Sequence, residues 1–440
     1  MTASDFDTIV VGARVAGAPL ATLLARAGQK VLLLDADKLP SDQPMSTHFV
    51  QAIGMDWLDE LGVGARIRAL APPSHRLRLD LLGHGITMSY AGGRAGCCVR
   101  RSVIDPVLQD AAVAAGAELR DRTEVVGLLR EGDRVVGVEA RSGDKTEALR
   151  ARVVVGADGR NSTVAKLTGA KEYLGYDNVR FSYWGYWPAP RSWTADPELA
   201  GFDGLLEFAA DRTLRFAYQC DGGLLMLSVA PELSALETYR GNHTAAYVEC
   251  LRAGRLTRLL VEDNQPVAPI HGFKKLRFFF RDAAGPGFAL VGDAGLHKDP
   301  TPGVGMTDAL RDARNLARAL LEGGDKALRR YHLQRDLDSL ELFHFAKELG
   351  DPSYINPLNA LVFERAKTRP QIAERLALSV DRVIAPQAAV PVRDVIGWTL
   401  GALLRGRFSV LPPFFASGKR NGQVAKLRAQ AAERLQLESP

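Results

Sequence analysis

The chain has 440 residues, of which 46% are hydrophobic and 24% are charged. This is the composition of a globular protein, and the length predicts two or three domains with large cores. The net charge is only +5, with acidic and basic residues interspersed, which argues against a nucleic-acid binder that relies on a basic patch. No uninterrupted apolar stretch approaches the roughly 20 residues of a membrane-spanning helix, so stable membrane insertion is not expected.

The cysteines and histidines suggest neither disulfides nor a metal site. Four cysteines, Cys97, Cys98, Cys220 and Cys250, form no CxxC pair, and two adjacent cysteines are poor disulfide partners. This usage, with no signal-peptide pattern at the N-terminus, predicts a cytoplasmic protein. The eight histidines are scattered without ligand spacing, so no metal is expected.

The first elements in chain order form a βαβ unit. Residues 8–11 are a short β-branched run typical of a buried parallel strand, residues 16–27 have helical spacing, and residues 30–34 form a second strand. A tight turn before a helix lets the backbone approach a pyrophosphate, and the helix N-terminus presents unpaired N–H groups to it. The unit therefore predicts a dinucleotide site.

The glycine fingerprint of such sites is only partly kept. G-x-G-x-x-G appears as Gly12, Arg14 and Gly17, so an arginine replaces the glycine that allows the closest backbone approach. Arg14 either makes a charge-assisted contact to phosphate or points outward. Asp35, 23 positions after Gly12, ends the second strand, where a carboxylate can bind a ribose diol.

An irregular loop, residues 38–50, follows this unit, because proline, serine and aspartate dominate it. It leads into an amphipathic helix over residues 50–61, for which Ser46 or Thr47 is the expected N-cap. His48 is interpreted either as a residue at the start of the helix or as a contact to cofactor or substrate.

Residues 76–100 predict strands and a turn, and residues 101–115 predict a helix. Residues 117–155 predict a three-stranded antiparallel excursion that returns to a buried parallel strand. Asp158 and Gly159 follow that strand, at the sheet edge where doubly wound proteins bind ligands, and the next helix is expected to be capped near Asn161 or Ser162. The alternative interpretation is that Asp158 and Gly159 form an ordinary Asp-Gly turn and bind no ligand.

Residues 171–280 predict a second domain built on an antiparallel sheet, interrupted by a helix near residues 245–260. Trp184 and Trp187 lie on one of its strand-like pieces. Aromatic residues on a sheet pack a core or form the wall of an apolar substrate pocket, and both roles can coexist.

A third motif occupies residues 286–323. Residues 288–291 predict a buried strand that ends at Asp293, and a loop rich in proline and glycine then precedes a long amphipathic helix that starts near Met306 or Thr307. Glycines directly before a helix again present backbone N–H groups to an electron-rich ligand. Beyond residue 351, proline breaks alternate with helices.

The βαβ unit with Asp35, the VGADGRNS segment and the LVGDAGLHKDPTPGVGM segment, in this order, resemble FAD-dependent monooxygenases of the aromatic-hydroxylase type. Geranylgeranyl-reductase-like enzymes and flavin-dependent halogenases share that fold. The resemblance covers about residues 5–345. It implies an α/β fold: a Rossmann-like FAD-binding domain with a parallel sheet, a substrate domain with an antiparallel sheet, and a helical C-terminal region.

The resemblance also implies domain boundaries. The expected FAD-binding domain comprises residues 1–75, 98–170 and 284–350. The expected substrate domain comprises the strands of residues 76–97 together with residues 171–283, and residues 351–440 form the helical C-terminal region.

The resemblance assigns FAD contacts to matching positions. It places the first glycine motif against the pyrophosphate and Asp35 on the adenosine ribose. Asp158 matches a motif that is associated with both FAD and nicotinamide binding. Asp293 matches the aspartate that hydrogen-bonds to the ribityl chain of the flavin. The loop of residues 303–306 would face the flavin ring. The expected FAD-binding residues are Gly12, Ala13, Arg14, Ala16, Gly17, Asp35, Ala36, Thr47, Arg101, Asp158, Gly292, Asp293, Pro300, Gly303, Val304, Gly305 and Met306.

Several positions depart from the pattern of the resembled enzymes. Lys166 stands where arginine is common, and the loop is GVGM followed by Thr307 instead of GQGM followed by asparagine. His297 lies next to this loop, where it either handles a proton or only fixes the loop. His297 and His48 are the expected catalytic residues, and Trp184 and Trp187 are the expected substrate contacts.

The leading hypothesis is a monooxygenase of secondary metabolism. It would use NAD(P)H and O2, through a flavin hydroperoxide, to hydroxylate or epoxidise an apolar, aromatic or polyketide-like small molecule. The sequence has a single dinucleotide fingerprint, which implies that NAD(P)H binds without its own Rossmann domain. The sequence does not decide whether a separate partner reduces the flavin or whether the protein forms a homodimer. The alternatives are a reductase of prenyl double bonds and a halogenase, although WGYWPAP does not match the halogenase W-x-W-x-I-P segment.

Overall fold

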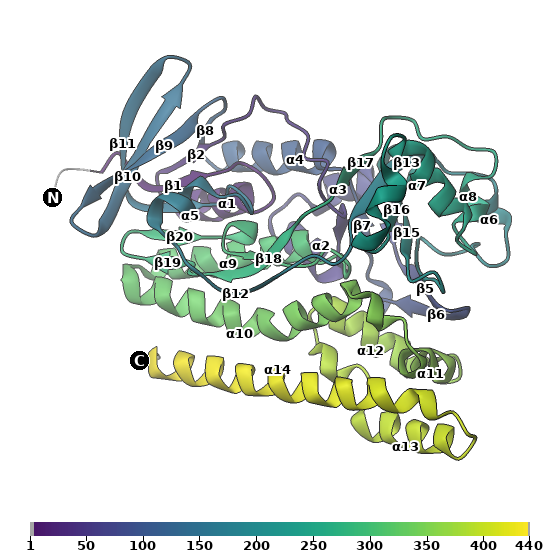
Figure 1. Cartoon of the computed structure of the whole chain (residues 1–440). Coiled ribbons are helices and arrows are strands. Elements are labelled where there is room, and N and C mark those ends of the chain that lie inside the picture. Colours follow the sequence, from purple (N-terminus) through teal and green to yellow (C-terminus); the bar gives the residue numbers. More distant parts are fainter. Residues whose placement is uncertain (1–3, 439–440) are drawn as a thin grey trace.

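A computed structural model describes residues 4–438. Figure 1 shows two sheet-based lobes side by side, with the C-terminal helices running beneath both. The expected fold class is confirmed: parallel and antiparallel sheets are joined to a helical C-terminal region.

The first lobe is built on a largely parallel sheet with the strand order β19-β20-β11-β1-β2-β8. The predicted βαβ unit is confirmed, because β1 pairs in parallel with both β2 and β11, and α1 connects β1 to β2. The elements are β1 (Phe6–Val11), α1 (Gly17–Arg26), β2 (Val31–Leu34), β8 (Glu118–Arg120), β11 (Lys145–Gly156), β19 (Ala284–Gly285) and β20 (Phe288–Leu290).

The antiparallel excursion is also confirmed. β9 (Glu124–Glu131) and β10 (Arg134–Ser142) form a hairpin that pairs with the first half of β11. The 12-residue β11 then continues into the parallel sheet, where its last residues pair with β1 and β20. One long strand therefore joins the hairpin to the sheet.

Helix α1 contacts both α4 (Arg101–Ala114) and α9 (Gly305–Glu322), and the three helices pack with the parallel sheet. Their apolar faces and the strands share one core cluster, in which Ile9, Leu20, Leu33 and Val154 are fully buried. The predicted start of the last of these helices is confirmed within two residues. The expected cap at Ser46 or Thr47 is wrong, because α2 (Ala52–Glu60) begins after Gln51 and Ser46 Oγ instead accepts from the His48 amide.

The second lobe contains a seven-stranded sheet with the order β17-β13-β16-β15-β14-β5-β6. Its strands are β5 (Arg76–Leu81), β6 (His84–Ser89), β13 (Ser182–Pro188), β14 (Gly204–Phe208), β15 (Leu214–Gln219), β16 (Leu224–Ala230) and β17 (His271–Phe273). The predicted interrupting helix is present as two pieces, α7 (His243–Arg252) and α8 (Arg258–Val261).

The two faces of this sheet pack against different partners, because side chains alternate along each strand. On β13, Tyr183 and Trp187 belong to the cluster that includes α7 and α8, whereas Trp184 and Tyr186 belong to the cluster that includes the C-terminal helices.

Two small sheets connect the lobes: β3 (Phe49–Val50), β4 (Pro73–Ser74) and β7 (Gly96–Cys98), and β12 (Glu172–Asp177), β18 (Arg277–Arg281) and β21 (Leu296–His297). The remaining α-helices are α3 (Gly64–Leu70), α5 (Thr163–Thr168), α6 (Ser192–Ala195), α10 (Gly324–Gly350), α11 (Pro357–Ala366), α12 (Pro370–Val380), α13 (Val392–Leu403) and α14 (Leu411–Glu438).

The C-terminal region is tied to the first lobe through buried charges. Asp308, in the first turn of α9, lies 2.7 Å from Lys298 Nζ and 3.2 Å from Arg382 Nε. The neighbouring Asp381 accepts a hydrogen bond from the amide of Ile53 at 2.6 Å. Arg382 and Asp381 follow α12 directly, so the end of this helix is fixed on the first lobe.

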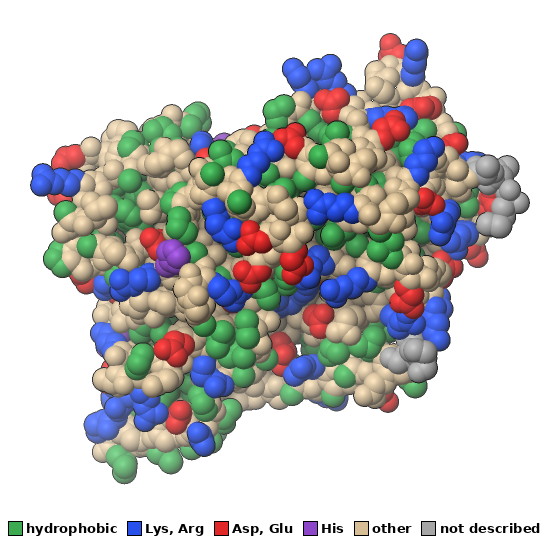
Figure 2. All heavy atoms as spheres, turned by 180° about the vertical axis from the view of Figure 1, so that it is seen from behind, with side chains coloured by type: hydrophobic (Ala, Val, Ile, Leu, Met, Phe, Trp, Pro, Cys, Tyr) green, Lys and Arg blue, Asp and Glu red, His purple; other side chains and the backbone are tan. Residues whose placement is uncertain are grey.

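Within residues 4–438, no helix is long and apolar enough to cross a membrane. Figure 2 shows acidic and basic side chains interspersed over the face that it displays, rather than gathered by sign.

Candidate functional site

A cavity of about 520 Å³ lies at the carboxyl ends of β1, β2 and β11 and extends to one face of the seven-stranded sheet. The carboxyl edge of a parallel sheet is the usual ligand edge of doubly wound folds. Residues from all three sequence motifs line this cavity, among them Gly12, Asp35, Asp158, Asp293 and Met306.

The first motif contributes a turn that is held tightly against β11. Gly12 has φ +104°, and a Cβ atom there would lie 2.5 Å from the carbonyl oxygen of Ala157. The helix that follows starts at Gly17, and Ala16, its N-cap, makes no side-chain cap. The Ala18 amide already donates to the carbonyl of Arg14 at 2.9 Å, so the N–H groups that can meet an electron-rich ligand are those just before it, where Val15 and Ala16 line the cavity.

Asp35 is buried at the end of β2 and lines the cavity. Its carboxylate accepts from the amide of Ala13 at 2.8 Å and from the amide of Asp37 at 3.0 Å. Each oxygen keeps a second lone pair, so the carboxylate is fixed in place and can still accept from a hydroxyl pair.

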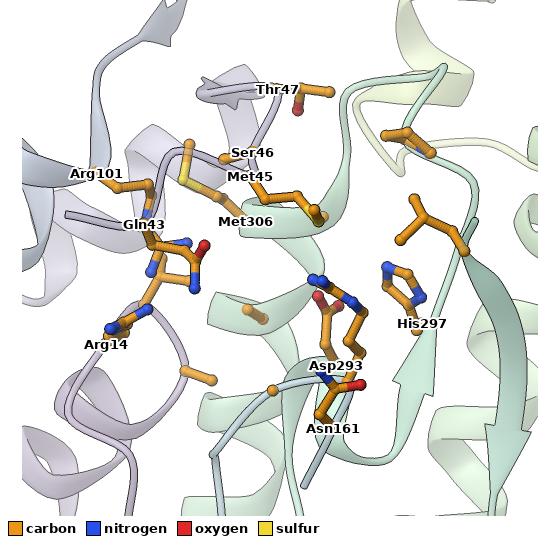
Figure 3. A pocket seen from close by; sticks show the side chains of 18 of the residues that line it. Arg14, Gln43, Met45, Ser46, Thr47, Arg101, Asn161, Asp293, His297 and Met306 are labelled. Atoms are coloured by element: carbon orange, nitrogen blue, oxygen red, sulfur yellow. The ribbon is translucent and has the colours of Figure 1, made fainter. Parts of the chain in front are cut away.

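Two arginines stand on the same side of the cavity, and Figure 3 shows Arg14 and Arg101 with Gln43 between them. Arg14 lines the cavity and forms an ion pair with the exposed Asp37, so both the contact to phosphate and the outward orientation stay open. Arg101 is held by Asp105 through two hydrogen bonds of 2.9 and 2.7 Å.

The third motif forms the opposite side, where Figure 3 shows Asp293 and His297 directed toward the cavity. Asp293 is exposed to the cavity at the end of the sheet. Helix α9 begins at Gly305 after an N-cap, Val304, that makes no side-chain cap, and a Cβ at Gly305 would meet nothing within 4 Å. A second uncapped helix N-terminus thus opens onto the same space.

His297 is 9% exposed, and its Nδ1 lies 2.7 Å from the carbonyl oxygen of Arg277. A carbonyl only accepts, so Nδ1 carries the hydrogen and Nε2 keeps a lone pair in the neutral ring. Burial lowers the pKa of His297, although the charge of Asp293 opposes this shift. His297 is therefore neutral near pH 7 and able to accept a proton.

The second motif lies at the end of β11. Asp158 accepts from Ser162 Oγ at 2.5 Å and from the Val164 amide at 3.2 Å, and Ser162 caps α5 as predicted. Burial raises the pKa of Asp158, and these hydrogen bonds oppose the shift.

Some of the remaining predicted residues line the cavity and others do not. Ala36, Thr47, Pro300 and Val304 line the cavity, whereas Ala13, Gly17, Gly292 and Gly303 are not among its lining residues. Trp184 borders the cavity. Trp187 does not, because it is on the other face of the sheet, where its indole N–H donates to Tyr247 Oη at 2.9 Å.

His48 is fully buried behind the lining, with Nε2 2.7 Å from Tyr186 Oη. Burial lowers its pKa to about 3. The structure thus does not bring His48 together with His297 on the cavity surface.

Sequence reasoning missed several lining residues. Asn178, Arg180 and Ser182 alternate along one chain segment with Trp184, and all four border the cavity. Strand alternation could have found Ser182, which shares β13 with Trp184, whereas Asn178 and Arg180 precede that strand and no sequence pattern indicated them. Among residues 4–438, no group of three or more His, Cys, Asp or Glu is placed to hold a metal ion.

Residues 5–190 match the protein-family model described as an FAD binding domain. This chain is an FAD-dependent oxidoreductase. The predicted resemblance to FAD-dependent monooxygenases and their reductase and halogenase relatives is confirmed.

The chain is 27% identical to the digeranylgeranylglycerophospholipid reductase of Methanocella arvoryzae over 349 residues, which cover 74% of this chain and 82% of that protein. It is 26% identical to the 2,4-dichlorophenol 6-monooxygenase of Delftia acidovorans, over 80% of this chain and 64% of that protein. The structure of a flavin-dependent brominase matches with a TM-score of 0.71 and 14% identity, over 91% of this chain and 99% of that one. At this low identity, the match to the brominase shows only that the two proteins share a fold.

The cavity fits FAD. Two uncapped helix N-termini, α1 and α9, direct backbone N–H groups into it, and such groups suit a pyrophosphate and an electron-rich flavin ring. Asp35 is held where it can accept from a ribose, and Asp293 presents a carboxylate at the opposite side.

The Asp293→Ala substitution is expected to weaken FAD binding at least tenfold, since the loss of a hydrogen bond to a charged group costs about 1.5–3 kcal/mol. The ratio of flavin to protein absorbance in the purified variant measures this loss. Asp133→Ala, an exposed hairpin residue, is the matched control. An unchanged flavin content in Asp293→Ala would contradict the assignment of this residue to the cofactor.

A second prediction concerns His48 and pH. The pKa of this residue is about 3 in the folded protein against an ordinary 6.5, so below pH 6.5 the unfolded chain takes up a proton that the folded chain excludes. Stability should therefore fall as pH drops through this window. Between pH 7 and pH 5 the wild type should lose about 2 kcal/mol more than His48→Gln, measured by urea unfolding. Equal losses in both proteins would refute the buried neutral imidazole.

Proposed function

We propose that this chain is an FAD-dependent monooxygenase that uses NAD(P)H and O2 to hydroxylate or epoxidise an apolar, aromatic or polyketide-like small molecule. One observation carries the proposal: a single cavity joins the FAD cradle to an apolar face of the second sheet. Its walls there are largely apolar and include Trp184, Leu214, Phe216, Met226, Phe273 and Phe278.

Bound FAD would supply the electron transfer and the activation of oxygen, so no side-chain nucleophile is required. The chain has three tasks. The apolar sheet face holds the substrate and excludes water. The uncapped N-terminus of α9 would hold FAD through backbone N–H groups and would favour negative charge on it. His297, neutral and with Nε2 free, accepts or returns a proton during the reaction.

NAD(P)H is proposed to approach through a basic groove of about 420 Å³ that shares Arg160, Asn161 and Leu276 with the cavity. Five basic residues line this groove against one acidic residue, Glu172: Arg160, Lys166, Lys275, Arg277 and Arg281. An excess of positive charge suits a pyrophosphate, and the position beside Asp158 agrees with the motif expected for nicotinamide binding. Reduction by a separate partner protein is the alternative route.

Lys166→Glu should raise the KM for NAD(P)H about fivefold or more, because the exposed ammonium at the groove is replaced by a carboxylate. Steady-state oxidation of NAD(P)H measures KM, and the rate of flavin reduction by dithionite should not change. Lys145→Glu, on an exposed hairpin turn, serves as the control. The same KM in both variants would favour a reductase partner.

A reductase of prenyl double bonds is the second candidate. It is supported by the 27% identity to a digeranylgeranylglycerophospholipid reductase over 74% of this chain. Both activities would use the same FAD cradle. They differ in whether reduced flavin reacts productively with oxygen.

Rapid mixing of the reduced holoenzyme with O2 separates the two candidates. A monooxygenase is expected to show a transient flavin absorbance that differs from both the reduced and the oxidised spectrum. If the protein is not a halogenase, added halide should leave the time course of this flavin absorbance unchanged. Direct return to the oxidised spectrum, with and without a panel of aromatic substrates, would contradict the monooxygenase and favour the reductase.

The four cysteines, Cys97, Cys98, Cys220 and Cys250, are all free thiols. Free thiols are typical of a reducing compartment, so we propose a cytoplasmic location.

A further inference from the structure

Helix α13 is apolar on both of its faces. Its inner face is buried through Trp398 and Ala402, which belong to the same core cluster as residues of α11 and α12. Its outer face carries a large apolar side chain at every fourth position, and these side chains are between 42% and 90% exposed: Val392, Ile396, Leu400 and Leu404. These four residues are called the α13 stripe. A surface helix normally presents polar side chains to solvent, so an apolar outer face indicates a missing partner.

The exposed apolar surface continues into the turn that follows α13. Phe408 and Phe415 are 65% and 67% exposed. Elsewhere in residues 4–438, exposed large hydrophobic residues are scattered along the chain, as on most protein surfaces. Figure 1 places α13 and the start of α14 at the lower edge of the molecule, away from both sheets. The stripe and the turn are thus a concentration of exposed apolar side chains at one edge.

The charged residues of the same segment are almost all basic. Residues 392–420 contain one acidic residue, Asp394, and five basic ones: Arg393, Arg405, Arg407, Lys419 and Arg420. Asp394 lies 3.5 Å from Arg369, and both Arg407 and Arg420 pair with glutamates of other helices. In the part of the chain that the structure describes, the other three basic residues make no ion pair. The exposed apolar edge therefore carries uncompensated positive charge.

This charge distinguishes between two possible partners of the stripe. A second copy bound through the same face in a symmetric dimer would bring the basic residues toward their own counterparts, and like charges oppose such an interface. An anionic phospholipid bilayer offers an apolar layer for the stripe and negative head groups for the arginines. Arg393 and Arg405 each directly follow a residue of the stripe, so their long side chains can reach head groups while the stripe is buried.

We propose that the α13 stripe and the turn after it dock the protein on the surface of an anionic phospholipid bilayer, with α13 parallel to the membrane plane. The 12 residues of α13 span about 18 Å, less than the roughly 30 Å of a hydrocarbon core, so the docking is peripheral. The combination of an apolar face with basic side chains supplies the two signals that stable attachment requires. The inference is independent of the proposed function, because the stripe lies outside the cavity.

The test is sedimentation of the FAD-loaded protein with two kinds of vesicle, one of phosphatidylcholine alone and one of equal parts phosphatidylcholine and phosphatidylglycerol. The protein should bind the anionic vesicles about tenfold more tightly or better, since each basic residue near an anionic surface adds to the attraction. Raising NaCl from about 0.05 M to about 0.5 M should remove most of this difference, because salt screens exposed charges.

Two variants separate the apolar from the electrostatic part. Leu404→Glu should weaken binding to the anionic vesicles about tenfold or more, because it replaces a buried apolar contact by a like charge. Arg405→Glu should weaken binding to the anionic vesicles to a similar degree and leave binding to the neutral ones unchanged. Both side chains are exposed and lie outside the cavity, so flavin content should equal that of the wild type.

The matched control is Leu437→Glu. Leu437 is 82% exposed and also lies on a helix, about 33 Å beyond Phe415 along α14. The same substitution there should leave both vesicle affinities unchanged. A loss of binding in Leu437→Glu as large as that in Leu404→Glu would overturn the assignment to α13.

Failure of the wild type to bind the anionic vesicles, equal affinity for both kinds, or full binding by Leu404→Glu would each contradict the proposal. A wild-type dimer that binds no vesicles and that Leu404→Glu converts to a monomer would assign the stripe to a second copy instead; light scattering of the eluted protein measures this. If Leu404→Glu does not retain its flavin, the salt dependence and Arg405→Glu still decide. The experiment uses oxidised protein without substrate, so its result is separate from that of the oxygen reaction.

Discussion

The close approach of the Gly12 turn to β11 is the constraint on which the rest of the structure depends. A Cβ at Gly12 would meet the carbonyl of Ala157 at 2.5 Å, and one at Gly17 would meet the carbonyl of Gly12 at 1.9 Å. This contact brings the N-terminus of α1 to the carboxyl edge of the sheet. Asp35, which accepts from the Ala13 amide, completes the turn. The cavity exists because these segments meet without side chains between them.

The two faces of the seven-stranded sheet pack against different parts of the molecule. On β13 the odd-numbered residues, such as Tyr183 and Trp187, pack against α7 and its neighbours, and the even-numbered residues face the cavity or the C-terminal helices. A single strand therefore packs the core of the lobe with one face and lines the cavity with the other. The FAD cradle and this wall come from different sheets, so substrate chemistry can vary while the cofactor site is kept.

The sequence predicted the elements that local pattern determines. The βαβ unit, the excursion into β11 and the cap at Ser162 all follow from strand periodicity, glycine turns and capping chemistry. The surroundings of His48 and Arg180 did not follow, because their partners lie more than 100 positions away or are backbone carbonyls brought together by folding. Trp184 and Trp187 are three positions apart on one strand, so alternation places them on opposite faces, but only the packing of the sheet decides which face borders the cavity.

The ion pairs around Asp308 have a consequence for how the chain could be shortened. The carboxylate is shared between Lys298, which lines the cavity, Arg311, and Arg382, which lies beyond α12. A protein cut before residue 351 would lose one of the cations around a buried acid at the first turn of α9, the helix whose N-terminus borders the cavity. Removing one partner of a buried ion pair is costly, so we expect a truncated chain to be less stable at the start of α9 than the full chain.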